Sequence, residues 1–136
     1  MRRKIIFDLD RTLWKCTVEY HPRIRLPPVN PETKNVLLYL QQQGYSLNIA
    51  SRSSEPEKCR KFIKKLFPKI KFDKYAIYPS EKNKLNHILD LNCEDGNFMI
   101  FDDEEKILQD IKKVYPLAVC VLCTQPVTWN IINPNI

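Results

Sequence analysis

The sequence predicts an α/β fold in three layers, with a doubly wound, five-stranded parallel sheet at its centre. Apolar runs of strand length alternate five times with segments of helical periodicity along the 136 residues, which is the pattern of strands joined by crossover helices. Two of the apolar runs end in paired acidic residues, as expected where parallel strands open onto a binding crevice. The hydrophobic content of 43% is enough for one core. We therefore expect a single domain, residues 1–136, with a Rossmann-like topology.

The first strand is the short apolar run that leads into Asp8. Prolines and mixed charges follow within residues 15–29, so we interpret this stretch as an irregular flap or minimal cap. Asn30 and Pro31 then combine a cap residue with a proline in the first turn, which predicts a helix that ends at Gly44.

The middle of the chain predicts two further pairs of strand and helix. Residues 45–50 read as a strand. Residues 54–57, SEPE, match a capping box, which predicts a helix with an apolar inner face and a basic outer face. A short strand over residues 75–78 and a helix over residues 84–91 follow.

The last part of the chain predicts one more strand, helix and strand. Residues 98–101 are fully apolar and lead into two acids. We expect a helix over residues 104–113 and a fifth strand over residues 117–122. The tail, residues 124–136, is expected to be loop with one short turn.

The composition limits the class of partner and the compartment. The formal net charge of +6 points only to something anionic, because charge governs association and not fold. No apolar stretch is long enough for a membrane span or a signal peptide, so we expect a soluble, intracellular, cytoplasmic protein, with the nucleus as an open alternative. The five cysteines are scattered and odd in number, which favours reduced thiols. Cys120 and Cys123 form a CxxC without a second pair, so we interpret them as core thiols.

Seven polar residues follow predicted strands, or begin a helix, at one edge of the sheet. They are Asp8, Asp10, Ser51, Arg52, Lys84, Asp102 and Asp103. The carboxylates would repel one another unless a cation lay among them, and hard oxygen ligands of this kind select Mg²⁺. The chain has only two glycines, so a glycine-rich phosphate loop is excluded. The sequence therefore predicts a site for magnesium and phosphate that is built from side chains.

Four motifs at this edge resemble those of the haloacid dehalogenase (HAD) superfamily of phosphotransferases, most closely its magnesium-dependent phosphatase-1 branch. In chain order they read IIFDLDRTLW, IASRSSEP, IYPSEKNKLNH and MIFDDEEK. The resemblance covers Lys4 to about Leu122. It implies a magnesium-dependent phosphatase that hydrolyses phosphomonoesters through an aspartyl-phosphate intermediate. Short segments after the first two motifs imply a capless or minimally capped member.

The resemblance also implies a role for each acidic position. Asp8 would be the nucleophile, and Asp10 would be the general acid and then the general base. Magnesium would lie between Asp8, the backbone carbonyl of Asp10 and the carboxylate of Asp102. Asp103 would be either a further member of the metal site or a cap of the following helix. We expect Asp10 on the same side of an extended strand as Asp8, because it stands two residues further on.

A second set of matching positions would contact the substrate. Ser51 would bind a phosphoryl oxygen, and Arg52 would orient the substrate. A motif lysine would offset the charge of the transferring group; Lys84 is the preferred assignment, and Lys82 is the alternative.

Further substrate contacts are assigned next to the acids and in the flap. Thr12 and Arg11 belong to the first motif, where Arg11 stands in place of the small or aromatic residue that is more common. Four flap residues are the expected specificity contacts, namely Tyr20, His21, Arg23 and Arg25.

Several alternatives stay open at this point. Each motif residue alone has a structural explanation, such as a strand end or a helix cap, but together they favour a phosphatase. The substrate is a phosphorylated small molecule, such as a sugar, or a phosphoprotein, including one with phosphotyrosine. The rival function is a catalytically weak HAD-fold binding or assembly protein that uses its basic surface. Nucleic acid is a further possible partner, and only the net charge supports it. His21 and His87 lie outside the set, with a surface or helix-packing role, and the oligomeric state is left open.

Overall fold

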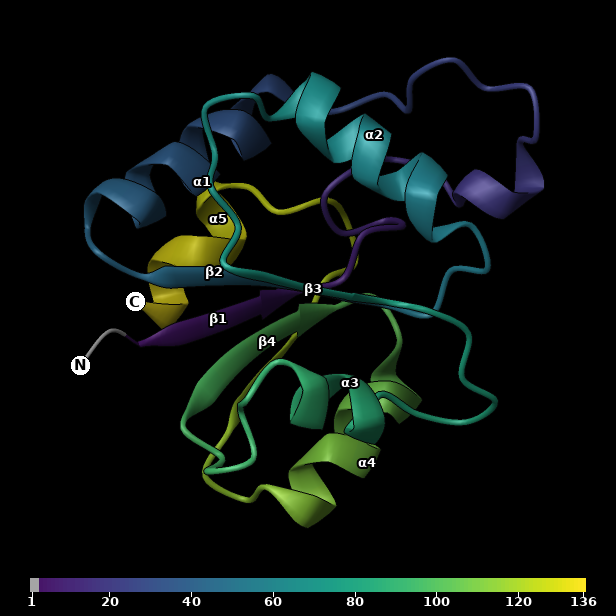
Figure 1. Cartoon of the computed structure of the whole chain (residues 1–136). Helices are drawn as coiled ribbons and strands as arrows, with labels where there is room; N and C mark the ends of the chain where they lie inside the picture. Colours follow the sequence, from purple (N-terminus) through teal and green to yellow (C-terminus); the bar gives the residue numbers. More distant parts are fainter. Residues whose placement is uncertain (1–2) are drawn as a thin grey trace.

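The computed structural model describes residues 3–136 and has one parallel sheet at its centre (Figure 1). The strand order is β3-β2-β1-β4-β5, and every pair of neighbours is parallel. The predicted α/β class and the number of strands are confirmed. The strands are β1 (Lys4–Phe7), β2 (Ser46–Ser51), β3 (Lys74–Ile77), β4 (Phe98–Asp102) and β5 (Val119–Leu122).

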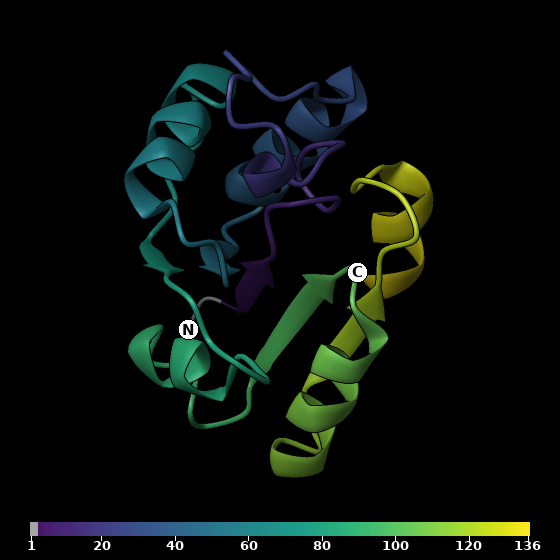
Figure 2. The same cartoon turned by 90° about the vertical axis from the view of Figure 1, so that its right-hand side faces the viewer.

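Helices cover both faces of the sheet and complete three layers. Figures 1 and 2 show α1, α2 and α5 on one face and α3 and α4 on the other. Within residues 3–136, no helix is both long and apolar enough to cross a membrane. The helices are α1 (Pro31–Gln42), α2 (Pro56–Leu66), α3 (Leu85–Asp90), α4 (Glu105–Val114) and α5 (Trp129–Ile132), with 3₁₀ turns η1 (Val18–Tyr20) and η2 (Asn133–Asn135).

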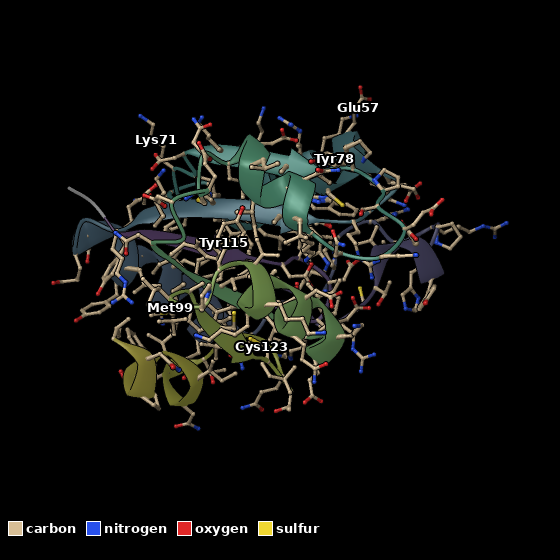
Figure 3. All side chains as sticks on the ribbon, turned by 90° about the horizontal axis from the view of Figure 1, so that it is seen from below. Glu57, Lys71, Tyr78, Met99, Tyr115 and Cys123 are labelled. Carbon is tan, nitrogen blue, oxygen red and sulfur yellow. The ribbon has the colours of Figure 1, made fainter. Side chains whose placement is uncertain are left out.

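Alternation along the strands divides the core between the two layers. Ile5 and Phe7 of β1 pack with the helices of the first face, whereas Ile6 packs with α3 and α4. Both faces of β1 are therefore buried, which explains its continuous apolar sequence. Figure 3 views the second layer from below, where the ring of Tyr115 packs edge-on against Phe98 at 5.5 Å between centroids.

The strand order places the topological switch point between β1 and β4. The chain moves from β1 outward to β2 and β3, and then returns to the other side of β1 for β4. The Asp8 amide donates to the Phe101 carbonyl at 3.0 Å, so the carboxyl ends of these two strands lie side by side. Doubly wound sheets bind their ligands at this place.

One of the two predicted helix starts is confirmed, and the other is wrong. The Asn30 side chain accepts from the Glu32 amide at 3.0 Å, and Pro31 opens α1. The capping box is not formed, because α2 begins at Pro56 after Glu55, with no side-chain cap. The Ser54 hydroxyl instead donates to Glu19 of the flap at 2.8 Å.

The tail forms more structure than a loop, because it packs against the first motif and α1. The Val127 amide donates to the Thr12 carbonyl at 2.8 Å, and the Thr33 hydroxyl donates to the Val127 carbonyl at 2.6 Å. The ring of Trp129 packs edge-on against Tyr39 at 5.3 Å between centroids. These contacts hold α5 and η2, where the sequence predicts loop with one short turn, so the helical part of the tail is longer than predicted.

Candidate active site

A tight turn follows β1 and carries the first motif. The Leu9 carbonyl accepts from the backbone amides of residues 12–14, at 2.9 to 3.3 Å. Arg11 has a φ of 63°, a left-handed conformation that costs a residue with a side chain about 1–2 kcal/mol. The expectation of an extended strand through Asp10 is therefore wrong, because β1 ends at Phe7 and the chain curls back.

The turn fixes the carboxylate of Asp10 at one oxygen. Asp10 Oδ1 accepts from the buried Trp14 indole at 2.8 Å and from the Val18 amide at 3.1 Å. Burial raises the pKa of Asp10, and these two hydrogen bonds oppose the rise. A raised pKa suits a carboxyl group that has to carry a proton at neutral pH.

Lys84 reaches into the same place from the start of α3. Its ammonium lies 2.8 Å from Asp8 Oδ1 and 2.5 Å from Asp102 Oδ2. Burial disfavours the charged ammonium, but Asp8 and Asp102 outweigh it and raise the pKa of Lys84. Lys84 is therefore a cation, and only 2% of its side chain is exposed.

The carboxylates of Asp8, Asp102 and Asp103 lie together next to this lysine. Each offers an oxygen, and the three oxygens are within 4.8 Å of one another. Burial raises the pKa of Asp8 well above its usual range, although Lys84 opposes it, and the pKa of Asp103 is also raised by burial. Thr12 Oγ1 lies 3.5 Å from Asp8 Oδ2 and is fully buried.

This cluster fits the predicted magnesium ion. One ammonium offsets only part of the negative charge of three close carboxylates, and a divalent cation with oxygen ligands would offset the rest. The side chain of Asp10 is outside the cluster, which agrees with a contribution from its backbone carbonyl alone. Asp102, and not Asp103, accepts from the amide that precedes α4, because Glu104 N donates to Asp102 Oδ1 at 3.0 Å.

Ser51 and Arg52 follow β2 at the same edge. Ser51 is buried, and its hydroxyl oxygen accepts from the Ser53 amide at 3.2 Å. The Arg52 guanidinium donates through Nη1 to the Ser80 carbonyl at 3.1 Å and through Nη2 to Glu104 at 2.8 Å. Arg52 therefore joins the loops that follow β2, β3 and β4.

His87 is buried and packs the helix, which agrees with the helix-packing alternative and not with the surface one. Its Nε2 lies 2.9 Å from the Ser51 carbonyl and 3.0 Å from the Tyr78 carbonyl. Because both partners only accept, Nε2 must carry the proton. The ring stacks on Tyr78 at 4.0 Å, and burial lowers the pKa of His87, so the imidazole is neutral.

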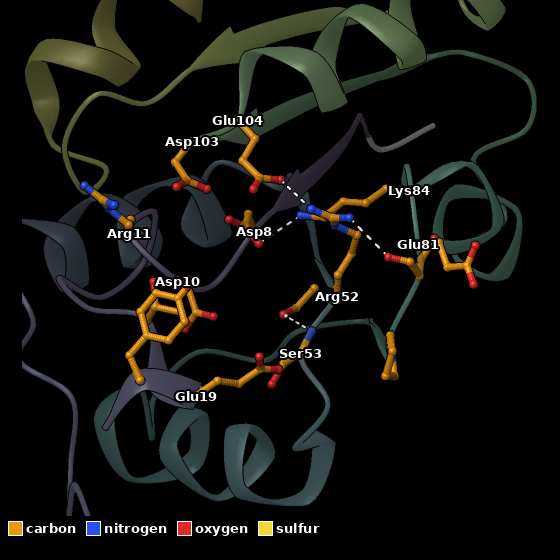
Figure 4. A pocket seen from close by; sticks show the side chains of 15 residues that line it. Asp8, Asp10, Arg11, Glu19, Arg52, Ser53, Glu81, Lys84, Asp103 and Glu104 are labelled. Atoms are coloured by element: carbon orange, nitrogen blue, oxygen red, sulfur yellow. Dashed lines mark hydrogen bonds and ion pairs between the residues drawn. The ribbon is translucent and has the colours of Figure 1, made fainter. Parts of the chain in front are cut away.

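These side chains line a pocket of about 560 Å³ at the carboxyl end of the sheet (Figure 4). Of the predicted residues, those that line it are Asp8, Asp10, Arg11, Tyr20, Ser51, Arg52, Lys84 and Asp103. Thr12 and Asp102 are buried directly behind it.

Lys82 and most of the expected flap contacts do not line this pocket. Lys82 is exposed, so the structure brings Lys84 to the acids and leaves Lys82 outside. His21 and Arg23 border a separate, shallow depression on the flap, and Arg25 borders neither. The lining residues that sequence reasoning missed are Thr17, Glu19, Ser53, Pro79, Ser80, Glu81 and Glu104. Most of them stand within two residues of a motif position, and this closeness in sequence could have predicted that they line the pocket.

Comparison with curated proteins finds one relative that matches most of the chain. No protein-family model matches the chain. Human magnesium-dependent phosphatase 1 is 30% identical over 132 residues, an alignment that covers 80% of this chain and 72% of that protein. The chain belongs to the magnesium-dependent phosphatase-1 branch of the HAD superfamily. The predictions of this family, of the phosphatase class and of magnesium as the metal are confirmed at the level of the family.

Solved structures share the HAD fold at low sequence identity. The D,D-heptose 1,7-bisphosphate phosphatase of B. bronchiseptica, in complex with magnesium and phosphate, has a TM-score of 0.71 at 10% identity, over 99% of this chain and 87% of that one. A putative HAD-like phosphatase of Mesorhizobium loti has a TM-score of 0.67 at 12% identity, over 89% and 72%. The phosphatase-domain part of Bacteroides fragilis BF1531 has a TM-score of 0.66 at 16% identity, and the match covers 88% of this chain but only 35% of that one.

Proposed function

We propose that this protein hydrolyses phosphomonoesters in two steps, through an aspartyl-phosphate on Asp8. The observation that carries this proposal is the position of Asp8 at the bottom of the pocket, between the buried cation of Lys84 and the carboxylate of Asp103. The ammonium of Lys84 orients this carboxylate and favours its charged form, which is the form that attacks an incoming phosphoryl group.

In the first step, an oxygen of Asp8 attacks phosphorus, and the bond from phosphorus to the ester oxygen breaks. The leaving oxygen takes a proton from the carboxyl group of Asp10 and departs as an alcohol. Because the hydrogen bonds from Trp14 and Val18 both end on Oδ1, Oδ2 is the oxygen of Asp10 that would face the leaving group.

In the second step, water attacks the phosphorus of the aspartyl-phosphate. Asp10, now ionised, takes a proton from this water, and the bond to the Asp8 oxygen breaks. Inorganic phosphate forms, and both aspartates return to their starting state, so a single turnover consumes one water and one ester.

The other polar residues would hold the phosphoryl group and the metal. Lys84 would offset the charge of the phosphoryl oxygens, and the Ser51 hydroxyl would donate to one of them. Asp8, Asp102 and the Asp10 carbonyl would bind magnesium, with Asp103 beside them. When bound, the ion would neutralise charge that develops on the transferring group.

Residues 15–29 would act as a small flap, and no cap domain would cover the site. An open pocket of this size admits either a phosphorylated sugar or a phosphorylated side chain of a protein. We favour turnover over the alternative of a binding or assembly protein without catalysis, because Asp8 and Asp10 both line the pocket with a hydrogen-bonded turn behind them.

Release of p-nitrophenol from p-nitrophenyl phosphate tests this function. We expect the wild type with magnesium to be active, and both Asp8→Asn and the chelator-treated wild type to lose nearly all activity. Equal rates in the three samples would contradict the proposal.

A further inference from the structure

The pocket has two electrostatically different parts. The deep part holds Asp8 and Lys84, where the phosphoryl group would react. The outer part, the rim, consists of the three glutamates Glu19, Glu81 and Glu104 and the two arginines Arg11 and Arg52. The rim would surround the leaving group, so its charges decide which leaving groups are accepted.

Arg52 is already paired with an acid, so it gives the rim no net positive charge. Its guanidinium lies between Glu104, which accepts from Nη2 at 2.8 Å, and the Ser80 carbonyl, which accepts from Nη1 at 3.1 Å (Figure 4). The charge of Arg52 is thus neutralised by Glu104 inside the pocket.

Glu19 brings a carboxylate from the flap to the opposite side of the rim. Its Oε1 accepts from the Ser54 amide at 2.6 Å and from the Ser54 hydroxyl at 2.8 Å. These hydrogen bonds lower the pKa of Glu19, so it is ionised at neutral pH. Glu81 adds an exposed carboxylate on the side of β3.

Arg11 is the other cation of the rim among residues 3–136, and it does not balance these acids. It is exposed, and its guanidinium lies at the far side of the pocket, away from Arg52 and Asp8 (Figure 4). With Arg52 and Glu104 paired, two glutamates face one distant arginine.

From this arrangement we infer that the enzyme takes phosphomonoesters whose leaving group carries no second anionic group. This inference rests on the proposed phosphatase function. Phosphomonoesters of neutral polyols, sugars and phenols would enter. Bisphosphates, phosphorylated carboxylic acids and terminal phosphates of a nucleic acid, whose leaving group carries anionic phosphodiesters, would be repelled by the rim. The net charge of +6 does not oppose this, because a group of its basic residues lies on the exposed face of α2, and these lysines and this arginine do not line the pocket.

Matched pairs of substrates that differ by one carboxylate test the inference. We would measure kcat/KM for phenyl phosphate against para-carboxyphenyl phosphate, and for glycerol phosphate against phosphoglycerate. We expect the neutral member to be preferred in each pair by about tenfold or more, because one further negative charge meets the acidic rim at short range. The aryl pair has the better leaving groups and gives a measurable rate even where the alkyl pair is slow.

Glu104→Gln is the decisive variant. It removes the charge that neutralises Arg52 but keeps the size of the side chain, so Arg52 becomes free to bind an anionic leaving group. We expect the preference for the neutral member to fall several-fold or to reverse. A residue with only a structural role would lower both rates together and leave their ratio unchanged. Glu57→Gln, an exposed acid on α2, makes the same change in net charge and should leave the ratio as in the wild type.

Each outcome separates the inference from the proposed function. No hydrolysis of any ester, p-nitrophenyl phosphate included, would overturn the proposed function and the inference with it. Hydrolysis in which the carboxylated member is equal or better would overturn the inference alone. A ratio that does not respond to Glu104→Gln would also overturn it, because the neutralisation of Arg52 would then not set the preference.

Discussion

The ammonium of Lys84 lies 2.8 Å from Asp8 Oδ1, and its side chain is only 2% exposed. The same ammonium lies 2.5 Å from Asp102 Oδ2, so one lysine holds two carboxylates that come from neighbouring strands. A buried ion pair of this kind is costly unless its members are fully paired. The cost of burying these charges is explained if Lys84 and the two carboxylates serve catalysis.

Replacement of Lys84 by Met should separate catalysis from metal binding. We expect activity to fall by about 100-fold or more, because the phosphoryl oxygens lose a buried cation. The magnesium-induced rise in Tm should be larger than in the wild type, since the carboxylates then lack their competing cation and the ion binds only the folded state. Activity assays and thermal unfolding with and without magnesium measure both effects.

Lys82→Met is the matched control, because Lys82 is exposed outside the pocket two residues away. It should change neither activity nor the response to magnesium. If Lys82→Met were the more damaging variant, the assignment of the motif lysine would be wrong.

Asp10→Asn should slow the enzyme according to the quality of the leaving group. Asparagine can still accept from Trp14 and Val18 but cannot donate a carboxyl proton. We expect kcat for an alkyl phosphate to fall by roughly 10²- to 10⁴-fold, and that for p-nitrophenyl phosphate to fall less, because nitrophenolate leaves without protonation. An equal loss on both esters would argue against Asp10 as the general acid.

His87 can be tested with two amide residues that place the donor differently. The Gln amide nitrogen reaches the position of Nε2, which donates toward the Ser51 and Tyr78 carbonyls, whereas the Asn amide is shorter. We expect His87→Gln to keep most of the stability and activity. We expect His87→Asn to lower the free energy of unfolding in urea by about 1–3 kcal/mol, because the Tyr78 carbonyl loses the imidazole donor and the Ser51 carbonyl keeps only the Tyr78 amide. Identical behaviour of the two variants would show that the donor at the position of Nε2 is not what stabilises this part of the fold.

The packing of the tail against α1 depends on a fully buried hydroxyl. Thr33→Val keeps the shape of the side chain but removes the hydrogen bond to the Val127 carbonyl at 2.6 Å. We expect a loss of about 1–3 kcal/mol in the free energy of unfolding, measured in urea. Thr124→Val, at an exposed position, should change it by less than about 0.5 kcal/mol. Comparable losses in the two variants would show that the buried hydrogen bond is not responsible.

The sequence was sufficient to predict the parallel sheet and the acidic residues that lie together at its carboxyl edge. Short, continuous apolar runs are typical of central parallel strands, and the positions that follow such strands, such as Asp8 and Asp102, meet at one edge of the sheet. The sequence left Lys82 and Lys84 as alternatives; the structure separates them, because Lys84 is the one that reaches the acids.

The parts that could not be predicted depend on contacts between distant segments. Ser54 matched a capping box by local spacing, but Glu19 of the flap accepts from it instead. The tail has a weak local pattern, and α5 exists because Val127 and Trp129 find partners on other elements. Such contacts join residues more than thirty positions apart, and no local periodicity carries them.

The central claim is that Asp8 becomes phosphorylated, and trapping that intermediate tests it most directly. The enzyme would be mixed with a phosphomonoester and magnesium, quenched in acid and reduced with borohydride, which converts an aspartyl-phosphate to homoserine. We expect peptide mass spectrometry to find homoserine at position 8, and not in Asp8→Asn. Phosphate release by the wild type without any modified residue, or with the modification at another aspartate, would contradict the account.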